Sequence, residues 1–152
     1  MNAPEQIMDI IEDLLQQPYW VIDFLPFQVP SDSRGQFFNV EQYYLNEARM
    51  KSFRQQMTDV LLKLNCYDGF HVVSGKGFHY EHNPSPEKTA SLIATPEYSI
   101  MILLETEPAL ITLDRDDLHA TIYHPSEKLL SLLKPLASAH GLFVWKPNEN
   151  GD

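Results

Sequence analysis

The sequence predicts an α+β fold, with a largely antiparallel sheet of about five to seven short strands and two or three helices packed on one face. A chain of 152 residues has the usual length of one domain. Helical periodicity dominates its first half, several short strand-like segments follow, and a helix and a strand come last. Because no repeat or long linker divides the chain, we expect residues 1–147 to form one domain and residues 148–152 a frayed C-terminal tail.

The first apolar residues recur with the spacing of one helix face. They are Ile7, Ile10, Ile11, Leu14 and Leu15. Pro18 cannot continue this helix, which should end near Gln16 or Gln17. Residues 19–25 are rich in β-branched and aromatic side chains, which predicts a strand.

Residues 36–45 fit a helix by spacing and a strand by aromatic content, and we favour a short helix. A clearer helix follows, with one apolar face made by Met50, Phe53, Met57, Val60, Leu61 and Leu64. Basic residues flank that face, namely Arg49, Lys51, Arg54 and Lys63. We expect them to be solvated or weakly paired, because exposed ion pairs contribute little.

Short strands dominate the next part of the chain. The strand segments are 70–73, 78–81, 99–105, 109–114 and 118–124, with a loop expected over 83–90. A leucine-rich helix should begin at Ser126, kink or split near Pro135 and close at His140 and Gly141. Residues 142–145 then predict a final strand.

Three histidines lie in the predicted hairpin of residues 69–83, and its register decides whether they meet. An odd-numbered loop would place His71 opposite His79 and beside Glu81, whereas an even-numbered loop sends His71 to the other face. The two glycines of the turn favour an even loop, with Gly75 or Gly77 at positive φ. A metal site would then have to recruit a histidine from another strand, such as His119.

Known catalytic and binding signatures are absent from the sequence. The hairpin histidines lack the spacing of zinc-protease motifs, and the glycine-rich turn lacks the Lys-Ser/Thr and helix of a phosphate loop. The sequence also contains neither a GxSxG nucleophile elbow nor a GxGxxG dinucleotide fingerprint. We therefore expect no cofactor.

The formal net charge is −10 and is unevenly distributed, since residues 1–33 carry six acidic residues and no Lys or Arg. Nucleic acids and anionic membranes would be repelled by such a surface. The acidic N-terminus does not resemble a signal peptide, and no apolar run is long enough to cross a bilayer, so we expect a cytoplasmic protein. Cys66 should be a buried, inert thiol.

About half of the aromatic residues lie between residues 19 and 44. Those in excess of the core would suit a partner-binding surface, for which the candidates are Phe37, Phe38, Tyr43 and Tyr44. The leading hypothesis is an acidic protein-binding module of inhibitor, adaptor or immunity type, with a basic protein as partner and homo-oligomerisation left open. The alternative is a small metal-binding hydrolase that uses His79, Glu81, His71 and His119.

Overall fold

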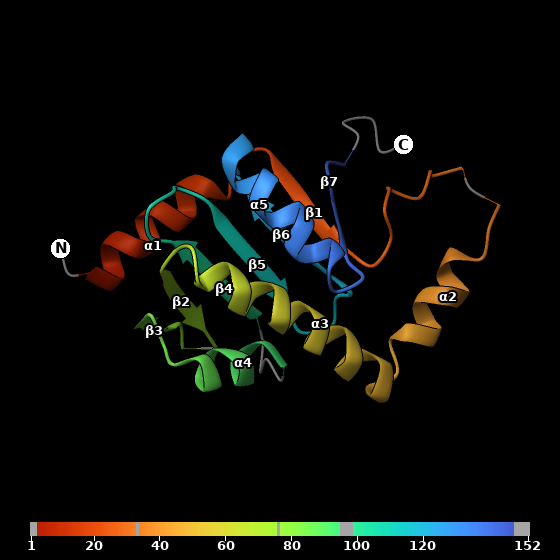
Figure 1. The fold of residues 1–152 in the computed structure, drawn as a ribbon, viewed down its shortest axis with the longest axis horizontal. Coiled ribbons are helices and arrows are strands. Elements are labelled where there is room, and N and C mark those ends of the chain that lie inside the picture. The colour runs from red at the N-terminus through yellow and green to blue at the C-terminus, as the bar shows by residue number, and fades with distance from the viewer. Residues whose placement is uncertain (1–2, 33, 76, 95–98, 148–152) are drawn as a thin grey trace.

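The computed structural model describes residues 3–32, 34–75, 77–94 and 99–147 of the chain, and this part has an α+β fold (Figure 1). Its helices are α1 (Ala3–Leu14), α2 (Phe37–Tyr44), α3 (Glu47–Asn65), α4 (Pro86–Ala94) and α5 (Glu127–Ser138). Its strands are β1 (Tyr19–Asp23), β2 (Phe70–Ser74), β3 (His79–His82), β4 (Ser99–Leu104), β5 (Leu110–Asp114), β6 (His119–Tyr123) and β7 (Phe143–Trp145). The α+β fold class is therefore confirmed, although the described residues form five helices where the sequence predicts two or three. The expected tail of residues 148–152 lies outside the described residues.

The strands form one antiparallel sheet in the order β3-β2-β4-β5-β6-β1-β7. The three strands β4, β5 and β6 pair in chain order, as a meander should. The N-terminal strand β1 then adds to β6, and the C-terminal β7 adds to the free side of β1. The first and last strands of the chain thus lie side by side at one edge of the sheet.

Helices α3, α4 and α5 cover one face of the sheet and enclose the larger core. The predicted face of α3 is confirmed, because Phe53, Met57, Val60, Leu61 and Leu64 are all buried. Met50, at the start of that face, is partly buried against the same core.

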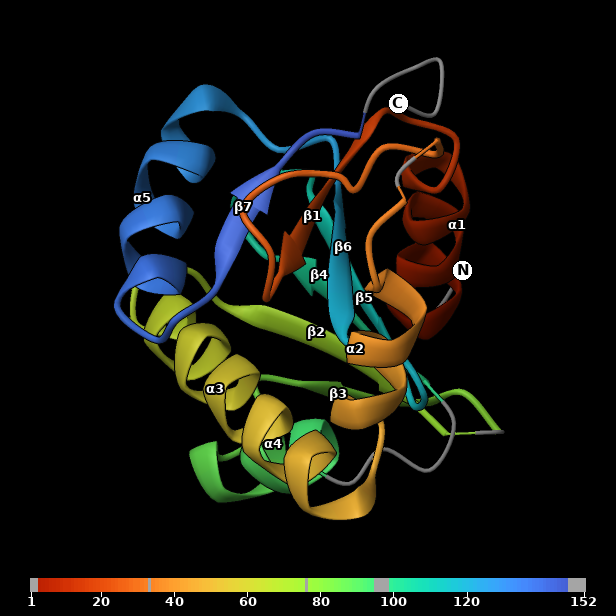
Figure 2. The same cartoon turned by 90° about the vertical axis from the view of Figure 1, so that its right-hand side faces the viewer.

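Helix α1 packs on the opposite face, so the helices do not all lie on one side as expected. Its buried Ile7, Ile11 and Leu14 form a second core with Val73 and other residues of the β2, β4 and β5 strands. Figure 2 shows the sheet between α1 on one side and α5 and α3 on the other. The alternation of side chains explains this arrangement, since Val72 and Val73 are both buried but point to opposite faces.

The prediction of a loop over residues 83–90 is wrong in part, because α4 begins at Pro86. A proline is well tolerated in the first turn of a helix, where its missing N–H has no partner to lose. The Ser85 hydroxyl accepts the Lys88 amide at 3.1 Å and caps the turn. Thr89 and Ile93 then bury one face of α4.

Helix α5 continues through Pro135 to Ser138, so it does not split at the proline. Its C-terminal end is as predicted. Gly141 has a φ of +75°, and the Leu142 amide donates to the Ala137 carbonyl at 2.9 Å.

Two single-residue expectations are wrong. Arg54 is only 2% exposed, although we expected a solvated side chain. Its guanidinium donates to the backbone carbonyls of Asp114, Arg115 and Asp117, in the turn between β5 and β6. Cys66 is exposed rather than buried, because it follows the last residue of α3. In the described ranges, no helix has the length and apolar character required to cross a membrane.

Candidate functional site

The β2–β3 hairpin has the predicted even-numbered loop. Ser74 pairs with His79 and His71 pairs with His82, whereas the expected register placed Val73 opposite Phe78. Gly75 has a φ of +78°, as expected for one of the two glycines. Because directly paired residues share a face, His71 lies on the opposite face from His79, as predicted.

The structure does not bring the four candidate metal ligands together. His79 and Glu81 share one face of β3, and Glu81 forms an ion pair with Lys88 of α4. His71 points to the other face, and His119 lies on β6, beyond β2, β4 and β5 in the sheet. Among the residues that the structure describes, no group of three or more His, Cys, Asp or Glu side chains could hold a metal ion.

The imidazole ring of His71 instead stacks on that of His82. The two rings have centroids 4.6 Å apart and planes 15° from parallel. The Tyr80 hydroxyl lies 2.9 Å from His71 Nδ1, and Glu105 Oε1 lies 3.2 Å from His82 Nε2. Burial and the neighbouring His82 lower the pKa of His71 below its ordinary value.

The four candidate partner-binding residues belong to α2, which lies at one end of the molecule (Figure 1). This helix has no buried residue. Phe38 is 76% exposed and Tyr43 is 54% exposed, while Tyr44 is less exposed and Phe37 is half-buried. Arg49 of α3 lies over the Tyr43 ring, 3.5 Å from its centroid, and this contact helps to connect α2 to α3.

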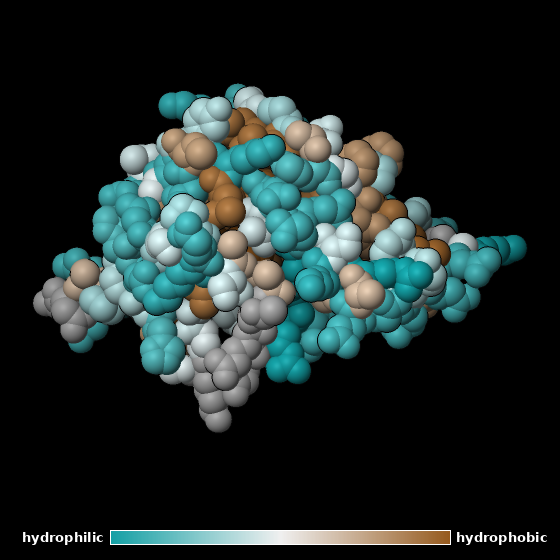
Figure 3. Space-filling model, turned by 60° about the horizontal axis from the view of Figure 1, so that its bottom comes forward, coloured by the Kyte–Doolittle hydropathy of each residue, from teal (hydrophilic) through white to brown (hydrophobic). Residues whose placement is uncertain are grey.

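Further apolar side chains are exposed close to α2 in the sequence. Phe27 in the preceding segment is 76% exposed, and Val40 of α2 is 42% exposed. Figure 3 shows hydrophobic atoms among hydrophilic ones on the right-hand side, the side on which Figure 1 shows α2. We call the four α2 aromatic residues together with Phe27 and Val40 the α2 surface.

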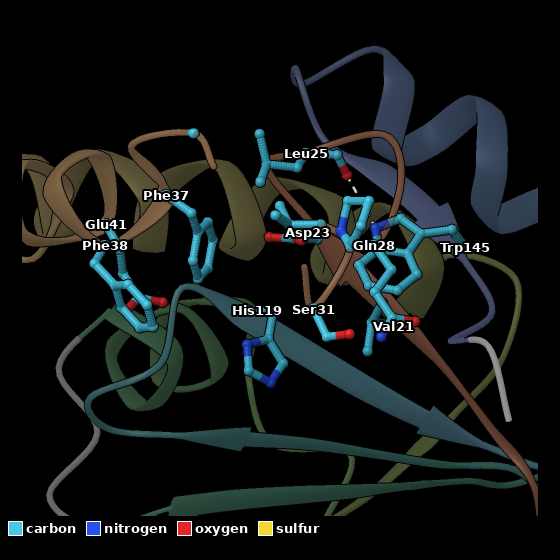
Figure 4. A pocket seen from close by; sticks show the side chains of 13 residues that line it. Val21, Asp23, Leu25, Gln28, Ser31, Phe37, Phe38, Glu41, His119 and Trp145 are labelled. Atoms are coloured by element: carbon cyan, nitrogen blue, oxygen red, sulfur yellow. Dashed lines mark hydrogen bonds between the residues drawn. The ribbon is translucent and has the colours of Figure 1, made fainter. Parts of the chain in front are cut away.

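A pocket of about 410 Å³ lies between α2 and the end of the sheet formed by β6, β1 and β7 (Figure 4). Its sheet wall comes from side chains of one face, because Val21 pairs with Trp145 and Asp23 pairs with His119. Residues 25–31, Gly35 and α2 provide the other walls, including Phe37, Phe38 and Glu41. Figure 4 shows Asp23 between Phe37 on one side and Trp145 on the other.

One face of the sheet carries both features. Helix α1 covers it over β2, β4 and β5, and the pocket lies on it over β6, β1 and β7. The Trp145 indole N–H donates to the Leu25 carbonyl at 2.9 Å and joins the last strand to the start of segment 25–35 (Figure 4). The pocket therefore joins residues from the first strand, α2, β6 and the last strand.

Asp23 is the most perturbed acidic group of the pocket. Burial raises the pKa of its carboxyl above the ordinary value, and the nearby Glu41 raises it further. The Phe24 amide, which donates to Asp23 Oδ1 at 2.8 Å, and His119 act in the opposite direction. Among the described residues, no Lys or Arg side chain forms an ion pair with Asp23.

Sequence reasoning missed Asp23, Glu41 and Trp145 as residues of one site. Asp23 stands in an apolar strand, YWVID, and an acid at the end of such a strand was the available signal. Trp145 could not be placed beside it, because the pairing of β7 with β1 joins residues from opposite ends of the chain. Of this site, the sequence indicated the helix Phe37–Tyr44 as a binding surface and His119 as a candidate metal ligand.

Comparison of the chain with protein-family models, with curated proteins and with solved structures found no match.

Proposed function

We propose that the protein is a cytoplasmic protein-binding module that engages a basic partner protein through the α2 surface. The single observation that carries this proposal is that α2 has no buried residue and yet presents exposed aromatic side chains. An isolated helix of this length is marginal in water, and most helices are stabilised by burying an apolar face. A partner that covers this face would provide the burial that α2 does not find in its own chain.

Aromatic side chains suit this role because they dominate interface energetics. The half-buried Phe37 and the more exposed Phe38 pack edge to face, with ring centroids 5.7 Å apart. Tyr43 and Tyr44 pack in the same way, at 5.4 Å. These contacts give the exposed rings fixed positions, which lowers the entropic cost of binding.

The charge of the chain favours a basic partner over a second copy. With a net charge of −10, two copies repel each other, whereas a positively charged protein is attracted over long range. Two carboxylates, of Asp23 and Glu41, also line the pocket beside the α2 surface.

The test is affinity capture from native lysate with the wild-type chain and two variants, at low and high salt. The double variant Phe38→Ser, Tyr43→Ser removes apolar area from α2 without opening the core. Tyr67→Ser is the matched control, because Tyr67 is 67% exposed at the far end of α3. We expect a stoichiometric basic protein that is retained by the wild type and by Tyr67→Ser, lost with the double variant, and weakened by salt.

Equal retention of that protein by the double variant would refute the α2 surface as the binding site. Capture that is independent of salt would refute the basic character of the partner.

A further inference from the structure

We infer that the pocket between β1, β6 and α2 binds an arginine side chain, with Asp23 as the counter-ion of its guanidinium group. This inference rests on the proposed function, because it names the chemical group by which the basic partner is anchored. It is argued from the chemistry of the pocket walls.

The walls combine aromatic rings with carboxylates. Phe37, Phe38 and Trp145 are three of the lining residues, and Asp23 and Glu41 are two more. Aromatic faces attract cations, and a planar guanidinium also stacks on them. A carboxylate next to such faces can accept two hydrogen bonds from the same guanidinium.

A bound cation would stabilise the carboxylate of Asp23. Its carboxyl group is partly removed from water. Among the described residues, Asp23 forms no ion pair. A buried carboxylate without a cationic partner is costly, and an incoming guanidinium would relieve that cost. Arginine suits such a site better than lysine because its charge is delocalised and less strongly hydrated.

The size of the pocket fits the same ligand. A volume of about 410 Å³ lies within the range of small-molecule sites, roughly 300–1,000 Å³. It has room for an extended side chain and for part of the peptide backbone that carries it. Phe38 both lines the pocket and is 76% exposed, so a protein covering the α2 surface could insert one side chain beside it.

His119 is the other titratable group on the sheet wall of the pocket, and it faces Asp23 across the β1–β6 pair. Glu41 of α2 is the acidic group on the opposite wall. Binding of the guanidinium should weaken at acidic pH, where Asp23 accepts a proton and loses its charge.

The experiment is an NMR titration of the full chain with Nα-acetyl-arginine methylamide. The indole N–H of Trp145 is the main reporter, because it lies in the pocket wall. The neutral citrulline analogue has nearly the same shape, and the lysine analogue has the same charge. We expect saturable shifts for the arginine probe, with a dissociation constant on the order of 1–10 mM for so small a ligand.

The citrulline analogue should bind at least about tenfold more weakly, and the lysine analogue should bind less tightly than the arginine probe. Asp23→Asn should weaken the arginine probe by a similar factor. Asp13→Asn, an equal charge change on the exposed side of α1, should leave it unchanged. Glu41→Gln is a second variant, and it cannot disturb the core because α2 has no buried residue. We expect it to weaken the affinity for the arginine probe by about twofold to threefold.

Equal binding of arginine and citrulline analogues, or equal effects of Asp23→Asn and Asp13→Asn, would overturn the inference. A probe that does not bind, while the α2 double variant still loses its partner, overturns the arginine pocket and leaves the proposed function standing. A third outcome is that the arginine probe binds in an Asp23-dependent way, while the partner protein is retained equally by the α2 double variant. That result supports the arginine pocket and refutes the proposed function.

Discussion

Asp23 and His119 lie directly opposite each other on neighbouring antiparallel strands, at the end of the sheet face that α1 leaves uncovered. This pairing gives the pocket one acidic and one basic side chain at its sheet wall. It also makes the ionisation of Asp23 a property that can be measured through stability.

We expect Asp23→Asn to stabilise the free protein at pH 7. The pKa of Asp23 is raised in the folded state, mainly by burial. The folded state therefore holds this proton more tightly than the unfolded state, and the associated stability is present at low pH and lost as pH rises through the folded pKa. Asparagine keeps the acceptor for the Phe24 amide without the charge.

Thermal unfolding of wild type and Asp23→Asn from pH 3 to pH 8 checks this prediction. The variant should unfold at the higher temperature at pH 7, and the difference should shrink as pH falls through the folded pKa and be lost below about pH 4, where the aspartate is protonated in both states. A variant that is less stable than wild type at pH 7 would contradict it.

Phe53→Ala should cost about 3–5 kcal/mol of unfolding free energy, because the ring is only 3% exposed in the core under α3. Met50→Ala, on the same helix face but partly buried, should cost less. Urea unfolding measures both. A loss below about 1 kcal/mol for Phe53→Ala would mean that the side chain is not in the core.

Arg54→Met should destabilise the fold by at least about 2 kcal/mol, although it replaces a charge with an apolar side chain. The guanidinium donates to carbonyls in the turn before His119, and these acceptors would be left partly unsatisfied. Lys51→Met is the control on the same helix, and its exposed side chain should matter by less than about 0.5 kcal/mol. Equal denaturation midpoints for the two variants would show that the Arg54 contacts add no net stability.

The contribution of His71 to stability should fall as pH drops from 7 to 5. Its pKa is lowered in the folded state, so the unfolded state takes up the proton first and is favoured as pH falls below the ordinary histidine value. His71→Gln should therefore lose less stability over this range than wild type. His79→Gln, on the opposite face of the hairpin, is the control for removing a histidine from this hairpin.

The sequence predicted what depends on neighbours in the chain. The buried face of α3, the short helix Phe37–Tyr44, the even hairpin loop and the glycine at the end of α5 all follow from local spacing or local backbone geometry. The sequence does not predict helix α4, because its prolines favour a loop, although Ser85 and Pro86 together begin a helix.

What the sequence could not predict depends on pairing between distant segments. Arg54 is buried because a turn some 60 residues later places three carbonyls around it. His71 meets His82 because of the register of the hairpin, and Asp23 meets His119 only once β1 adds to β6. The second core under α1 likewise requires the sheet to exist before its two faces can be told apart.

Deleting residues 142–152 should unfold the domain, because the last strand supports both the core and the pocket. Leu142 is fully buried, and β7 covers the free side of β1. Trp145 would also leave, and with it the hydrogen bond that its indole donates to Leu25. Deleting only residues 148–152 is the control, and we expect that chain to melt like the full-length protein. If the chain ending at residue 141 keeps a full cooperative melt at an unchanged temperature, β7 is peripheral to the fold.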